Sequence, residues 1–156
     1  MARAQVYYIE FIIAIFFFTL MLGLFVNSVI SAQDDSGLGP LTTEARAVSE
    51  HLMSEGVPGD WNLSNVQKIG LTDGKSRINE TKLQMFSNMS YSQTRSALNI
   101  GSEYYFYLED RNSSRILIAG KQGIGLEPAD AKRVIKNLRL AIYGSEIVKM
   151  VVLVWQ

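Results

Sequence analysis

The side chains that enzymes and metal sites use most often are scarce in this chain. Cysteine is absent, and His51 is the only histidine. Thiol nucleophiles, cysteine-ligated zinc and sites with several histidines are therefore excluded. The sequence pairs no serine with a base, and the carboxylates are scattered through expected loops and helix ends. We expect His51 to be a solvated surface residue and the protein not to be an enzyme.

Three segments resemble parts of a calcium loop, a phosphate-binding loop and an aromatic ligand site. Asp73-Gly74 lacks the alternate carboxylates of a calcium loop, so we read it as a turn. Gly123-Ile-Gly125 lacks the third glycine and the Lys-Ser/Thr ending of a phosphate-binding loop, so we read it as a connector. The run Tyr104-Tyr105-Phe106-Tyr107 could line a ligand face but is more typical of a half-buried strand. We predict no metal and no cofactor.

Four Asn-X-Ser/Thr tripeptides are candidate sites of N-glycosylation, more than the composition of the chain predicts by chance. The alternative is ordinary turn chemistry in a domain rich in Asn and Ser. N-glycans require a translocated, surface-facing asparagine, and all four sites follow the apolar segment described next. The four asparagines are Asn62, Asn79, Asn88 and Asn112.

Near the N-terminus, a long apolar segment follows one isolated carboxylate. No residue from Phe11 to Gln33 is charged, and Glu10 stands at the edge of this run. The run exceeds the ~20 residues that a helix needs to cross a bilayer. Glu10 can be read as a boundary carboxylate at headgroup depth, or as a group retained to pair with a positive charge of another subunit.

Three interpretations of this segment remain open. It can be a retained transmembrane anchor, a secretory signal cleaved after Ser31-Ala32, or a buried helix of a soluble protein. We favour the anchor, because the run is long for a signal and a small domain can hardly enclose a helix that is apolar on all sides. Arg3 precedes the run and Asp34-Asp35 follows it, so we expect the N-terminus in the cytoplasm and the C-terminal domain outside.

The first residues of the chain resemble a known family. Arg3-Ala4-Gln5, followed by Glu10 and the apolar run, resembles the start of archaeal type IV pilin precursors. The resemblance implies that a prepilin-type peptidase cuts between Ala4 and Gln5, which makes Glu10 the sixth residue of the mature chain. It also implies that the apolar helix packs with its copies in a filament, and that Glu10 pairs with a neighbour's amino terminus. Residues 56–71, 77–83 and 146–155 resemble small archaeal pilin-like surface proteins more loosely.

These observations predict four parts of the chain. They are a possible leader at 1–4, a transmembrane or filament-core helix at 5–32, a linker at 33–41 and an extracytoplasmic α+β domain at 42–156. In that domain we expect a helix capped by Thr42 or Thr43 and ended by Gly56, with Trp61 in the core. Two further short helices are expected at 79–86 and 92–98.

The remaining segments of the domain are typical of strands. We expect extended segments at 66–71, 103–110 and 115–119, and a C-terminal hairpin of 134–143 with 146–155 around the turn at Gly144. A helix over 129–142 is the open alternative, because its apolar residues also fit helical spacing. The predicted fold class is therefore α+β: a long N-terminal helix, then about four antiparallel strands flanked by short helices.

The net charge of the chain limits the classes of partner that it can bind. Lys and Arg number 15, as do Asp and Glu, so the chain offers no basic excess for a nucleic acid. We expect contact with membrane lipid and self-association through the apolar helix. The leading hypothesis is a non-enzymatic pilin or pilin-like subunit. The alternative is a single-pass signal-anchor protein whose outer domain binds a partner or ligand without polymerising, and a secreted enzyme is the least favoured.

Overall fold

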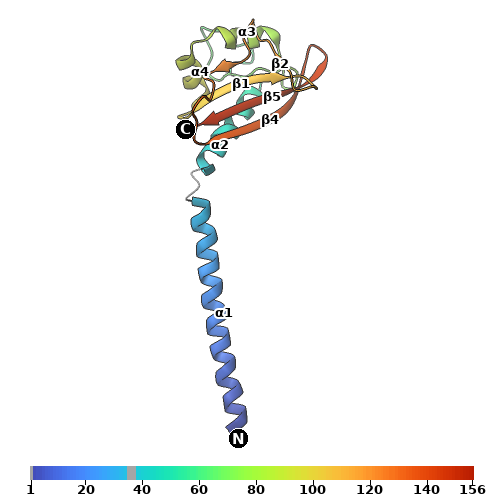
Figure 1. The fold of residues 1–156 in the computed structure, drawn as a ribbon. Helices are drawn as coiled ribbons and strands as arrows, with labels where there is room; N and C mark the ends of the chain where they lie inside the picture. Colours follow the sequence, from blue (N-terminus) through green and yellow to red (C-terminus); the bar gives the residue numbers. More distant parts are fainter. Residues whose placement is uncertain (1, 35–37) are drawn as a thin grey trace. The chain divides into compact units, whose positions relative to one another are not determined.

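The computed structural model describes the backbone of residues 2–34 and 38–156 and the side chains of residues 9–30 and 38–156. The chain divides into two compact units, Met1–Gly39 and Pro40–Gln156. The first unit contains helix α1 (Ala2–Asp34) (Figure 1). Within it, Ile9–Ile30 forms a stretch of 22 residues that is long and apolar enough to cross a membrane.

The junction after α1 differs from the predicted linker at 33–41. Residues 35–37 of this linker lie outside the described residues. On either side of them, α1 continues to Asp34 and α2 (Leu38–Leu52) already contains Gly39 and Pro40. The predicted helix start at Thr42 or Thr43 is therefore wrong. Pro40 is accommodated because the first four N–H groups of a helix have no partner within it.

Two short helices of the second unit begin at side-chain caps. Helix α3 (Glu80–Asn88) is capped by Asn79, whose side chain accepts a hydrogen bond from the backbone N–H of Lys82. Helix α4 (Tyr91–Leu98) begins with a capping box between Ser90 and Gln93. Each cap satisfies N–H groups that the helix itself leaves unpaired. These helices confirm the two predicted at 79–86 and 92–98, with boundaries that differ by one or two residues.

Five antiparallel strands form the sheet. They are β1 (Glu103–Glu109), β2 (Arg115–Ile116), β3 (Ile124–Gly125), β4 (Val134–Tyr143) and β5 (Glu146–Trp155). Their order is β2-β1-β5-β4, with β3 also paired to β1 (Figure 1). The sheet therefore has one strand more than the four expected, and its long outer strand is β4.

The C-terminal hairpin is confirmed at the predicted residues. Tyr143 pairs with Glu146 across a two-residue turn in which Gly144 has φ 57° and Ser145 has φ 74°. Two positive φ angles define the turn that matches the twist of a hairpin. The alternative helix over 129–142 is wrong, because burial along β4 alternates with a period of two from residue 134 to residue 140.

Two other predicted extended segments differ from what was expected. Strand β2 has two residues instead of 115–119, because Ile118 and Lys121 exchange both backbone hydrogen bonds across a tight turn. The chain then returns as β3. The predicted extended piece at 66–71 is not a strand: Lys68 forms only an isolated bridge with Val57, and Leu71 donates instead to the carbonyl of Leu52.

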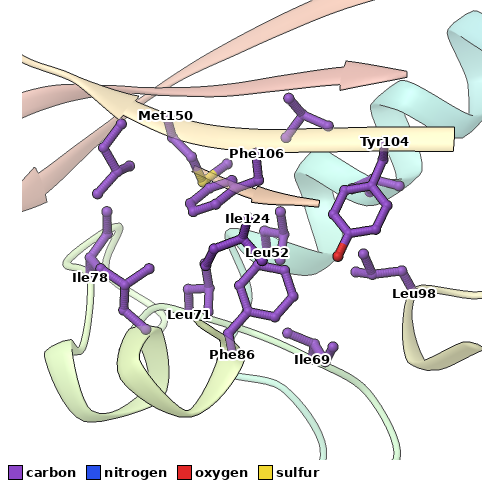
Figure 2. Packing of buried hydrophobic residues seen from close by; sticks show 14 of the residues in the cluster. Leu52, Ile69, Leu71, Ile78, Phe86, Leu98, Tyr104, Phe106, Ile124 and Met150 are labelled. Carbon is purple, nitrogen blue, oxygen red and sulfur yellow. The ribbon is translucent and has the colours of Figure 1, made fainter. Parts of the chain in front are cut away.

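One face of the sheet packs against α2, α3, α4 and the loops between them. Figure 2 shows Tyr104, Phe106 and Met150 from the strands meeting Leu52 and Phe86 from the helices. All members of this core cluster lie between Leu41 and Val154, so residues 38–156 carry a core of their own. Trp61 belongs to it, as predicted, and its Nε1 atom donates to the carbonyl of Gly70 at 2.8 Å.

Candidate functional site

The surface of α1 is the first candidate site. Every side chain from Ile9 to Ile30 is exposed, and the apolar residues are distributed around the whole helix. Exposed apolar area of this extent is unfavourable in water and is stable in lipid or against other helices. Glu10 is exposed at the start of this stretch, and it forms no ion pair with any side chain of residues 9–30 or 38–156. Ala4 and Gln5 lie in the helix, but their side chains are outside the described residues.

One side of α1 has small and polar residues among the apolar ones. Thr19, Gly23 and Asn27 are spaced four apart, so they lie on one face of the helix. The Thr19 hydroxyl donates to the carbonyl of Ile15 at 2.8 Å and is therefore satisfied within the helix. A Cβ atom added at Gly23 would contact nothing within 4 Å. Small residues at this spacing allow two helices in a membrane to approach closely.

The four predicted glycosylation asparagines are all exposed. Asn62 lies in the loop after Trp61, Asn79 caps α3, Asn88 ends α3, and Asn112 lies in the turn between β1 and β2. None of them belongs to the sheet. The structure thus leaves each asparagine accessible to a modifying enzyme, and the strands β2 to β5 carry no such site.

His51 does not lie in a catalytic arrangement. It is half-buried rather than solvated, which corrects the prediction, because its ring lies at the end of α2 against the following loops. Its Nδ1 atom is buried, without a hydrogen-bond partner in the described part of the chain. Burial, followed by the positive charge of Lys68, holds the pKa of His51 below its usual value. The neutral ring is therefore favoured, and neither a nucleophile nor an orienting carboxylate among residues 9–30 and 38–156 is hydrogen-bonded to it.

A group of titratable side chains joins α4 to β1. The Tyr91 hydroxyl donates to Glu103, and Arg95 Nη1 lies 3.0 Å from Glu103 Oε1. Burial, and then the hydrogen bond to Glu103, raise the pKa of Tyr91 to about 12. Burial also raises the pKa of Tyr104, whose hydroxyl donates to Thr94. Because both phenols are neutral at ordinary pH and fully engaged, this group stabilises the packing and supplies no general base.

The tyrosine run of β1 is divided between the two faces of the sheet. Tyr104 faces the main core, whereas Tyr105 and Tyr107 lie on the opposite face, in a second cluster with Val151 and Trp155. Arg115 stacks over Tyr107, with the guanidinium carbon 4.7 Å from the ring centre. All these tyrosines are buried by the chain itself. The run therefore forms a covered strand, and its rings do not line an open ligand face.

A groove of about 390 Å³ lies on the second unit. It lies between the loop that follows Trp61 and helix α4, and its lining mixes apolar and polar side chains: Leu63, Val66, Gln67, Met89, Gln93, Ser96 and Ala97. No charged group lines it. Two of the candidate glycosylation asparagines, Asn62 and Asn88, each precede a lining residue directly.

Comparisons with protein families, with curated proteins and with solved structures find no match to this chain. Among residues 9–30 and 38–156, no group of three or more His, Asp or Glu side chains could hold a metal ion. The features that remain are the bare apolar surface of α1, the exposed asparagines and the outer strand β4.

Proposed function

We propose that the protein is a non-enzymatic, membrane-anchored surface protein that assembles with its copies through α1, in the manner of a pilin or pilin-like subunit. The observation that carries this proposal is the stretch Ile9–Ile30, whose side chains are predominantly apolar and exposed on every side of the helix. The second unit has a complete core without it. A helix of this kind needs lipid or neighbouring helices around it, because water solvates it poorly.

Glu10 gives this assembly its register. A carboxylate at the edge of an apolar helix is costly unless it remains at the interface or pairs with a positive group. In a bundle of parallel copies, that group is the amino terminus of a neighbour, which removal of residues 1–4 before Gln5 would create. Gly23 supports the same arrangement, because its missing side chain leaves room for a helix from another copy.

The topology follows from the same anchor. The N-terminus faces the cytoplasm, and residues 38–156 lie outside the cell, where Asn62, Asn79, Asn88 and Asn112 carry N-glycans. A glycan coat on the loops and helix ends protects the exposed domain.

The decisive experiment compares Glu10→Ala with a control, Glu146→Ala, which removes an exposed carboxylate from the first residue of β5. Expressed in the native host, Glu10→Ala should abolish surface filaments in electron micrographs, while the protein still fractionates with the membrane. Glu146→Ala should form filaments normally. Mass analysis of the wild-type chain should give a mature start at Gln5. Normal filaments from Glu10→Ala would overturn the role of this residue.

The groove beside α4 favours a second candidate function, a single-pass signal-anchor protein that binds a small ligand and does not polymerise. Its volume is within the range of about 300–1,000 Å³ that is typical of ligand sites. In this case the N-terminus remains at Met1, and no filament forms. A start at Gln33 would instead indicate a secreted protein.

A further inference from the structure

The outer edge of the sheet is open along most of β4. This strand is the last in the order β2-β1-β5-β4, and Figure 1 shows it with β5 on one side only. Near its end, Ile142 donates to the carbonyl of Ser76 and accepts from the N–H of Ile78, so its backbone groups point away from β5. Backbone groups alternate along a strand, so those of residues 134, 136, 138 and 140 point the same way. No other segment of the described chain pairs with them.

The side chains of these same residues are exposed and mostly apolar. Val134 is 42% exposed, Leu138 44% and Leu140 61%, while Lys136 stands between the first two. The neighbouring part of this face is different, because the loop before β4 places Ala131 against Tyr105, Tyr107, Val151 and Trp155. The chain thus covers this face over β1 and the C-terminal half of β5 and leaves it bare at β4.

The charge around this edge is strongly positive in a chain that is neutral as a whole. Residues 130–140 contain Lys132, Arg133, Lys136 and Arg139 against Asp130 alone, so four positive charges and one negative charge give a net of +3. The side chain of Arg139 is 40% exposed. Its Nη2 atom lies 3.8 Å from Glu50 Oε1, at the long end of the range for an ion pair. Lysine at an exposed edge opposes pairing with an identical strand, because the like charges would meet.

We propose that β4 is a docking site for an acidic extended segment of another protein, which adds to the sheet as a sixth strand. The open N–H and C=O groups supply the hydrogen bonds of strand addition, and alternate side chains give the specificity. The segment carries apolar side chains opposite Val134, Leu138 and Leu140 and an acidic one opposite Lys136. The basic residues that disfavour a second copy are those that select an acidic partner.

No candidate glycosylation site lies on β4 itself. All four asparagines precede β2, and the one asparagine of β4, Asn137, is followed by Leu-Arg and forms no acceptor sequence. The proposal is independent of how α1 assembles, because it uses only residues of the second unit.

The test uses the full chain in detergent micelles and two fluorescein-labelled octapeptides. The first peptide has four alternate positions that face β4 in an antiparallel pairing. Glutamate occupies the one opposite Lys136, and valine occupies the other three. The second has lysine in place of this glutamate. The first should bind more tightly than the second. Lys136→Glu should weaken binding of the acidic peptide about fivefold and strengthen binding of the lysine peptide. The substitution turns the attraction of the first peptide into repulsion and the repulsion of the second into attraction. A reversal of this kind cannot result from misfolding.

Two substitutions at Leu138 test the backbone contribution. Leu138→Pro removes an N–H that points away from β5, so the pairing of the hairpin is retained and peptide binding should fall more than tenfold. Leu138→Thr retains the N–H and should bind within about threefold of the wild type. Absence of binding by the acidic peptide, or binding of this peptide to Leu138→Pro as tight as to the wild type, would overturn the proposal. The proposal would also be overturned if the wild-type protein forms dimers that Leu138→Pro abolishes, because the strand bound at β4 would then come from a second copy.

Discussion

Replacing Lys82 by methionine should destabilise the second unit by about 2 kcal/mol. The side chain of Lys82 is buried, and its ammonium donates to the carbonyl of Glu55 at 2.8 Å and to that of Thr72 at 3.4 Å. Lys82 thus joins α3 to two loops. A hydrogen bond from a charged group contributes about 1.5–3 kcal/mol, and only the shorter of these two bonds has near-ideal length. Methionine preserves the apolar stem but leaves both carbonyls without this donor.

The assay is urea unfolding of residues 38–156, monitored by the fluorescence of the buried Trp61 and Trp155. With an m-value of about 2 kcal/mol/M for a domain of this size, the midpoint should fall by about 1 M. Lys75→Met is the matched control, because Lys75 is exposed and its backbone N–H still donates to Asp73. A midpoint that stays constant or rises would refute the reasoning. It would mean that burying the ammonium costs as much as its hydrogen bonds return.

Two further predictions concern ionisation and glycosylation. Tyr91 has a pKa of about 12 against an ordinary 10.0, so its contribution to stability is complete below pH 10 and is lost as the pH rises towards 12. Alkaline unfolding of Tyr91→Phe should therefore depend less on pH than that of the wild type over this interval. Removing each candidate sequon should lower the mass of the native protein by one glycan. Asn79→Gln should also cost about 1 kcal/mol, because Asn79 caps α3, whereas Thr81→Ala should remove the same glycan and preserve the cap. An unchanged mass in every variant would contradict the glycosylation.

Local patterns in the sequence predicted the elements whose signals agree with each other. The hairpin from Val134 to Trp155 was predictable because a glycine turn separates two segments rich in β-branched residues. Helix α3 was predictable from apolar residues at helical spacing, whereas its cap by Asn79 is a finding of the structure. The start of α2 was not, because Gly39-Pro40 is a strong sign of a turn, and only the freedom of the first helical turn allows it inside a helix.

The properties that depend on distant contacts could not be read from the sequence. The half-burial of His51 depends on loops that contact the end of α2, and nothing beside it in the chain indicates them. The buried position of Lys82 likewise requires carbonyls that lie 27 and 10 residues away along the chain. The sequence predicted a strand at 134–143, but only the strand order shows that β4 is the outer strand.

The net charge of the chain is zero, but its positive and negative charges are unevenly distributed along the sequence. Removing the net charge of +3 of residues 130–140 leaves −3 for the remainder of a chain that sums to zero. Exposed charges separated by more than ~8 Å interact weakly at physiological ionic strength, so a partner senses the local balance and not the total. Neutrality therefore argues against a protein that coats a nucleic acid, but it leaves room for a short acidic strand at β4. Such binding should weaken as salt is added, while apolar assembly through α1 should not. The dependence on salt thus separates the two contacts in one protein.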